Sequence, residues 1–93
     1  MAVATVTAAI SAQNTFTDSI GLGPGEFNLS VWGTFVGTVT VQRSFDAGVT
    51  WLDVETFTTP SEEVGRDATG ALYRIGVKTG QYTSGTANVR LSQ

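Results

Sequence analysis

Carboxylates are the side chains of this chain whose type and spacing could support catalysis or metal binding. Asp53 and Glu55 lie two positions apart in a run of strand-forming residues, so a regular strand would place both on one face, as an acid/base or glycosidase pair requires. Glu62, Glu63 and Asp67 could bind a hard cation such as calcium, but they lack the dense alternation of oxygen ligands found in loop sites. Acids on one strand face more often form a solvated surface that resists aggregation. We therefore expect surface and loop carboxylates here rather than a catalytic or metal site.

The residue types that most catalytic sites need are missing from this sequence. It contains no cysteine and no histidine, so it lacks the thiolates of disulfides and metal sites, the commonest metal ligand and the usual acid/base group. Ser–His–Asp and Cys–His catalysis therefore lack their usual parts. Because a hydrolase would have to work with carboxylates alone, we predict a protein that is not an enzyme and that binds no cofactor and no metal.

Residues 43–51, with the sequence "RSFDAGVTW", place an aspartate, a glycine and a tryptophan between two runs of alternating strand formers. A short polar turn between strands needs such groups, because aspartate accepts hydrogen bonds from turn amides and glycine tolerates a positive φ. The stretch fits the pattern S-x-D-x-G-x-T-W and resembles the Asp-box, a β-hairpin motif of sialidases and many unrelated β-proteins. The matching residues are Ser44, Asp46, Gly48, Thr50 and Trp51. The resemblance implies a structural turn that Asp46 locks, with Trp51 packed beneath the hairpin as a core anchor.

The elements that must position these residues are strands. Fifteen threonines, eleven valines and eleven glycines match the residues favoured in strands and turns, and apolar residues do not recur at a helical spacing. Apolar and polar side chains alternate in the segments 2–10, 16–22, 26–32, 38–44, 49–57, 71–78 and 86–92. Residues 60–70 are polar and begin with a proline, so we expect a loop with a short strand around Val64.

Seven or eight short strands at roughly ten-residue spacing indicate a small antiparallel β-sandwich. Eight strands in two sheets make a jelly roll, which is the form we expect, whereas about seven would suit the alternative, an immunoglobulin-like sandwich. Residues 1–93 have the length of a single domain. Residues 1–14 are largely apolar or small, so they could form an edge strand or an arm that adds to a neighbouring subunit's sheet.

Charge and hydropathy narrow the range of partners. The formal net charge is −3, and the five basic side chains are scattered, which argues against a basic patch for nucleic acid. No apolar run approaches the ~20 residues of a membrane span, and the N-terminus lacks the basic region of a signal peptide. We expect a soluble protein that binds neither nucleic acid nor membrane and that is made without export through a signal sequence.

Three aromatic residues, Trp32, Phe35 and Tyr82, fall on a strand face opposite the main core stripe or in expected loops. Aromatic rings in such positions stack on sugars or anchor protein interfaces. Alternatively, the second sheet or a folded-back loop covers them. Whichever of the three stays exposed is a candidate contact with a partner.

Over nearly its whole length the chain resembles small proteins encoded among the virion structural genes of tailed bacteriophages and prophages. The segments that carry this resemblance are "ISAQNTFTDSI", "FNLSVWGTFVGTVTVQRSFDAGVTW" and "ALYRIGVKTGQYTSGTANVRL". It implies a capsid cement (decoration) protein, a β-sandwich that binds the major capsid protein on the outer surface of the head as a homotrimer. Its location would be the virion, assembled in the cytoplasm of the bacterial host. The alternative is a carbohydrate-binding or structural module of a phage tail or fibre.

Overall fold

The computed structural model describes residues 4–93, which contain eleven β-strands and no helix. The strands are β1 (Thr5–Ile10), β2 (Thr15–Phe16), β3 (Ile20–Leu22), β4 (Gly25–Trp32), β5 (Phe35–Gly37), β6 (Val39–Ser44), β7 (Leu52–Phe57), β8 (Ser61–Asp67), β9 (Ala71–Val77), β10 (Tyr82–Gly85) and β11 (Ala87–Ser92). Within these residues, seven strands have six or more residues, and β2, β3, β5 and β10 are shorter.

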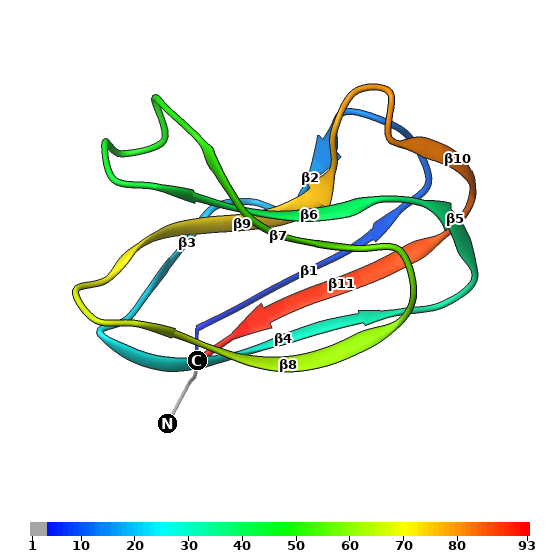
Figure 1. The fold of residues 1–93 in the computed structure, drawn as a ribbon. Coiled ribbons are helices and arrows are strands. Elements are labelled where there is room, and N and C mark those ends of the chain that lie inside the picture. Colours follow the sequence, from blue (N-terminus) through cyan, green and yellow to red (C-terminus); the bar gives the residue numbers. More distant parts are fainter. Residues whose placement is uncertain (1–3) are drawn as a thin grey trace.

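The long strands form two sheets that pack face to face (Figure 1). Sheet A has the order β1-β11-β4-β8. Sheet B has the order β2-β9-β6-β7, and β3 also pairs with β9, at the start of that strand, whereas β2 pairs with its end. Every pairing between neighbouring strands of the two sheets is antiparallel.

The strand pairs are nested along the chain. β1 pairs with β11, β2 and β3 pair with β9, β4 pairs with β8, and β6 pairs with β7. If β2 and β3 are taken as one interrupted strand, the nested pairs form one long hairpin that is rolled into two sheets. This arrangement gives the strand order of a jelly roll. The fold is therefore a small β-sandwich with jelly-roll order rather than an immunoglobulin-like one.

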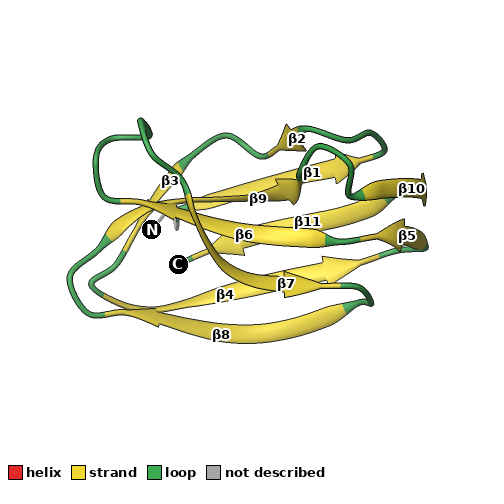
Figure 2. Ribbon diagram, turned by 45° about the horizontal axis from the view of Figure 1, so that its top comes forward, coloured by secondary structure: helices red, strands yellow, loops and turns green. Residues whose placement is uncertain are grey.

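A third, two-stranded ribbon closes one end of the sandwich. β5 pairs with β10, and this ribbon lies where the chain passes between the two sheets (Figure 2). Thr38 donates its amide to the carbonyl of Gln81, and Thr86 donates its amide to the carbonyl of Thr34, both at 2.8 Å. The ribbon therefore ties the β4–β6 crossing to the β9–β11 crossing.

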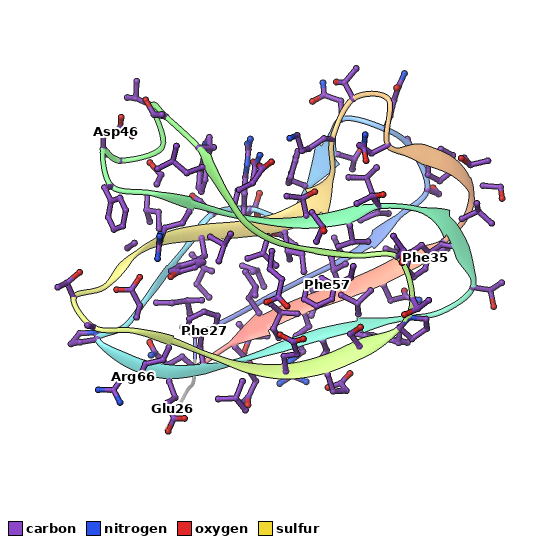
Figure 3. The ribbon with its side chains drawn as sticks, viewed as in Figure 1. Glu26, Phe27, Phe35, Asp46, Phe57 and Arg66 are labelled. Atoms are coloured by element: carbon purple, nitrogen blue, oxygen red, sulfur yellow. The ribbon has the colours of Figure 1, made fainter. Side chains whose placement is uncertain are left out.

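The core lies between the sheets and is built from alternate residues of the long strands. Phe27, Leu29 and Val31 of β4 are buried, and Phe27 packs against Tyr73 of β9 with ring centroids 4.9 Å apart. Figure 3 shows Phe27 and Phe57 pointing between the two layers. The other buried apolar residues are Ile10, Leu22, Val39, Val41, Phe57, Ile75, Val77, Ala87, Val89 and Leu91.

Residues 61–67 form β8, so the short strand expected around Val64 is present but longer than expected, and most of the range 60–70 is strand rather than loop. β8 lies at the edge of sheet A and, among the described strands, pairs only with β4. An edge strand needs one neighbour and can keep polar side chains in water, which is why polarity was a poor guide here. A Cβ atom at Gly65 would lie 2.5 Å from Cζ of Phe27, so the Phe27 ring packs directly on the backbone of β8.

The N-terminal segment includes β1, which lies at the edge of sheet A and pairs with β11 from Thr5 to Ile10. Ile10 is fully buried, so β1 contributes to the core of its own domain. The part of the expected arm that comprises residues 1–3 lies outside the described residues.

Candidate functional site

The hairpin between β6 and β7 is closed by its own side chains, near the tip that carries Asp46 (Figure 3). Oδ1 of Asp46 accepts hydrogen bonds from the amide of Thr50 and from the hydroxyl of Ser44, both at 2.8 Å. The Ser44 hydroxyl accepts the amide of Gly48, also at 2.8 Å. Ala47 and Gly48 have φ angles of 60° and 90°, and glycine adopts such a turn at the least cost.

These contacts give Asp46 a structural role. The hydrogen bond from the Thr50 amide, followed by that from Ser44, holds the pKa of Asp46 below its ordinary value of 3.8. The carboxylate is therefore charged at neutral pH and acts as the acceptor that closes the turn. This is the hydrogen-bond pattern that the sequence predicts for a turn-locking aspartate.

Trp51 lies half-buried and outside the buried core, which corrects the expectation of a core anchor. The guanidinium of Arg74 lies 4.4 Å from the Trp51 ring and 4.1 Å from the ring of Phe16. Arg74 is on the outer face of sheet B because its neighbours Tyr73 and Ile75 point into the core. Sequence reasoning missed this cluster because Phe16 of β2, Trp51 just before β7 and Arg74 of β9 are far apart in the chain, and the pairing of their strands was unknown.

A chain of hydrogen bonds continues from Arg74 across the outer face of sheet B. Arg74 Nε donates to Gln42 Oε1 at 2.8 Å, and Gln42 Nε2 donates to Asp53 Oδ1 at 2.9 Å. Lys78 Nζ donates to the other oxygen of Asp53 at 2.7 Å. Lys78, and after it Gln42, lowers the pKa of Asp53, and burial lowers the pKa of Arg74. Both oxygens of Asp53 are thus held in contacts within the protein.

Asp53 and Glu55 do not share one face of β7, so the pairing expected from the sequence is wrong. Glu55 lies opposite Val41 and Asp53 lies opposite Gln42, which leaves Val54 as an extra residue. Such a β-bulge interrupts the two-residue alternation of a strand. Asp53 therefore joins the outer face of sheet B, whereas Glu55 lines an opening between the two sheets.

The acidic residues Glu62 and Glu63 of β8 also lie on different faces of their strand. Glu62 accepts a hydrogen bond from the hydroxyl of Ser30 at 2.7 Å, on the outer face of sheet A. Glu63 is opposite Leu29 and lines the opening between the sheets. Residues 4–93 contain no group of three or more acidic side chains placed to hold a metal ion.

Asp67 is buried, with a side chain only 4% exposed, so the expectation of a solvated carboxylate is wrong at this position. It accepts hydrogen bonds from the amides of Thr69 and Gly70 at 3.0 and 2.7 Å and from the hydroxyl of Tyr73 at 2.6 Å. Arg43 Nη1 lies 3.9 Å from the same carboxylate. The Tyr73 hydroxyl is the main cause that lowers the pKa of Asp67, and burial raises the pKa of Tyr73. Asp67 closes the β8–β9 turn and fixes it to β9.

A cleft of about 90 Å³ opens between the edge strands β7 and β8. Val54 and Glu55 of β7 and Glu63 and Val64 of β8 line it, together with core side chains such as Phe27. Burial, and after it the neighbouring Glu63, raises the pKa of Glu55 above its ordinary value of 4.5. No basic side chain among residues 4–93 forms an ion pair with either glutamate. The cleft therefore brings two carboxylates together, and neither forms an ion pair with Arg43 or Arg66, which also line it.

Comparisons with models of protein families, with curated proteins and with solved structures find no match to this chain. No helix that could span a membrane lies within residues 4–93.

The three aromatic residues expected as contacts differ in their exposure. Trp32 is 44% exposed at the end of β4, on the outer face of sheet A, opposite Asn88 of β11. Phe35 and Tyr82 belong to the β5–β10 ribbon and are half-buried against the core. The Tyr82 hydroxyl donates to the carbonyl of Gly85 at 3.0 Å. Trp32 is therefore the exposed aromatic residue of the three.

Five other large apolar side chains, which sequence reasoning did not single out, are exposed on the β6–β7 hairpin and the edge strands β7 and β8. They are Phe45, Val49, Leu52, Val54 and Val64, with exposed fractions from 46% to 83%, and we call them the apolar strip. Figure 1 shows these elements following one another around one side of the molecule. The sequence held a signal, because the run "VTWLDVETF" has apolar residues at both odd and even positions, and a strand of a two-layer sandwich buries only one of its faces.

Proposed function

We propose that this chain is a non-enzymatic structural protein that acts by attaching to another protein, as a capsid cement protein does on a phage head. The observation that carries the proposal is the apolar strip. Several large apolar side chains exposed on a soluble domain favour an interaction site, because covering them removes apolar area from water. A domain of 93 residues buries a limited share of its own surface, so attachment to a partner would also stabilise it.

The contacts of three aspartates support a role without catalysis. Asp46 closes a turn, Asp53 is held by Gln42 and Lys78, and Asp67 accepts hydrogen bonds from two backbone amides and from the Tyr73 hydroxyl. These contacts give each aspartate a part in holding the fold. A structural protein needs such groups for stability and needs no free acid/base pair.

The proposed partner is the major capsid protein or another virion protein, and the proposed location is the outer surface of the capsid. A homotrimer is the proposed form, since cement proteins of this kind bind where capsomers meet. Jelly rolls occur in viral capsid proteins and also in lectins, so the fold is compatible with this role without specifying it.

Quantitative mass spectrometry of purified virions tests the proposal. Hundreds of copies per particle are expected of a cement protein, whereas a few copies would move the protein to the tail, and its absence would reject a virion role. Binding of the purified protein to assembled particles should then be weakened by Val54→Ser in the apolar strip. Val36→Ser is the matched control, because Val36 is 58% exposed on β5, outside that strip.

A second candidate is a carbohydrate-binding module of a tail or fibre, and the position of Trp32 favours it. Trp32 is exposed on a sheet face with Ser30 and Asn28 along β4 and Asn88 across from it, and an aromatic ring beside hydrogen-bonding side chains suits a sugar. Binding on a glycan array that disappears in Trp32→Ala would favour this candidate. Stoichiometric binding to glycan-free capsids would favour the cement protein.

A further inference from the structure

The edge formed by β7 and β8 has the features of a site for an extended protein segment. β7 pairs only with β6 among the described strands, so its other side presents unpaired backbone groups. Leu52 and Val54 of β7 and Val64 of β8 are about half or more exposed along this edge. An added strand would cover apolar side chains and gain backbone hydrogen bonds at the same time.

The charges at this edge specify the occupant. Glu55 and Glu63 approach each other across the cleft between β7 and β8, and no basic side chain of the described residues forms an ion pair with them. Arg43 and Arg66 also line the cleft. The guanidinium of Arg43 lies by Asp67, Arg66 is in register with Glu26 and lies beside it (Figure 3), and neither arginine forms an ion pair with Glu55 or Glu63. A lysine or arginine from a partner would supply the missing positive charge.

The bulge at Val54 makes this edge selective. A bulge interrupts regular pairing, so β7 cannot take up an arbitrary long strand. Pairing is limited to a short stretch beside Glu55. The contact between a basic side chain and the two carboxylates then has to supply much of the discrimination between one partner segment and another. An apolar residue next to that basic residue would meet the exposed side chain of Val54 on β7.

We propose that the edge formed by β7 and β8 binds an extended segment of a partner protein that places a lysine or arginine, flanked by apolar residues, between Glu55 and Glu63. This inference rests on the proposed function in that it requires a protein partner. It adds the place of attachment and the chemistry of the segment that is recognised.

The test is a titration of the isotope-labelled protein with two capped peptides, followed by NMR. One peptide has the sequence Thr-Val-Lys-Val-Thr and the other has Gln in place of Lys. The lysine peptide should shift the backbone amides of β7 and β8, with an affinity in the millimolar range for so small a contact. The variant Glu55→Gln/Glu63→Gln should weaken this binding roughly tenfold. Glu62→Gln is the matched control on the same strand and should bind as the unmodified protein does.

A second variant with reversed charge keeps the inference testable if Glu55→Gln/Glu63→Gln fails to fold. Glu63→Lys should bind a Thr-Val-Glu-Val-Thr peptide more tightly than the lysine peptide. Equal binding of the lysine and glutamine peptides, shifts confined to another edge such as β1, or no shifts at millimolar peptide would overturn the inference. Particle binding that is unchanged in Glu55→Gln/Glu63→Gln would overturn the inference but leave the proposed function standing. Peptide binding by a protein that is absent from virions would reject the proposed function and leave the site standing.

Discussion

At the scale of single residues, the charged side chains of this domain mainly hold turns and strands in place through hydrogen bonds and stacking. Asp46 and Asp67 each gather amide hydrogen bonds at a turn, and Arg74 is held by Trp51 and Gln42 on the outer face of sheet B. Removing one partner of such a contact leaves the other without its hydrogen bonds, which costs more than the contact contributes on its own. Stability measurements on single substitutions are therefore informative at these positions.

Asp67 should make stability depend on pH in the acid range. Its pKa in the folded protein is below the ordinary value of 3.8, so its contribution is present above that value and is lost as pH falls through the folded-state pKa. Asp67→Asn should lower the free energy of unfolding at neutral pH by about 1–3 kcal/mol. Urea denaturation across the acid range should show this deficit shrinking as the pH falls. Asp18→Asn, at an exposed position, is the control, and an equal effect there would contradict a special role for Asp67.

Arg74 should not tolerate replacement by lysine. A lysine side chain at this position would keep the positive charge but lose the planar guanidinium beside Phe16 and Trp51 and the hydrogen bond to Gln42. We expect Arg74→Lys to reduce the free energy of unfolding by about 1–2 kcal/mol and to change the fluorescence of Trp51. Arg90→Lys, on the exposed side of β11, should have little effect on either measurement. Equal stability of the two variants would show that the stacking contributes nothing.

At the scale of elements, alternation in the sequence was a good guide where a strand has one buried face. The pattern of Phe27, Leu29 and Val31 located β4, and similar patterns located β6, β9 and β11. It underestimated β8, for which only a short strand around Val64 was expected, because an edge strand has few buried positions to show a pattern. It also failed at Val54, because a bulge depends on pairing with β6, which no local pattern reveals. The cleft with Glu55 and Glu63 was missed for the same reason.

Adding one methyl group at Gly65 should weaken the contact between β4 and β8. Gly65→Ala places a Cβ atom where the Phe27 ring lies, so we expect a loss of about 1–3 kcal/mol in the free energy of unfolding. A smaller side chain in Phe27→Leu should recover part of that loss in the double variant. Gly21→Ala is the control in β3, because a Cβ atom there has no neighbour within 4 Å. Chemical denaturation of the four proteins measures the coupling between the two positions.

The β6–β7 hairpin should loosen when its aspartate is removed. Asp46→Ala deletes the acceptor for the Thr50 amide and the Ser44 hydroxyl, so the melting temperature should fall and the amides of residues 46–50 should exchange faster with solvent. Asp46→Asn retains an oxygen acceptor, so its melting temperature should lie between those of the unmodified protein and Asp46→Ala. Unchanged stability together with loss of a binding or catalytic activity would instead make Asp46 a functional residue.

At the scale of the whole molecule, the nested strand pairs bring the two ends of the chain together. Thr5 pairs with Ser92, and the amide of Gln93 donates to the carbonyl of Ala4 at 2.9 Å. The outermost pair, β1 with β11, therefore closes the longest loop in the chain and lies at the edge of sheet A. Closing long loops is slow, so a jelly roll of this kind should fold slowly for its size.

A circular permutant separates the speed of folding from the stability of the fold. A short glycine-serine linker from Gln93 to Met1, with new termini between Thr59 and Pro60 in the exposed β7–β8 connection, turns β1 and β11 into a local hairpin. The same strand pairs remain, so the free energy of unfolding should change little, whereas the mean separation of contacting residues falls and refolding should be faster. Stopped-flow refolding measures this. An unchanged refolding rate with unchanged stability would mean that the pairing of β1 with β11 forms only after the rate-limiting step.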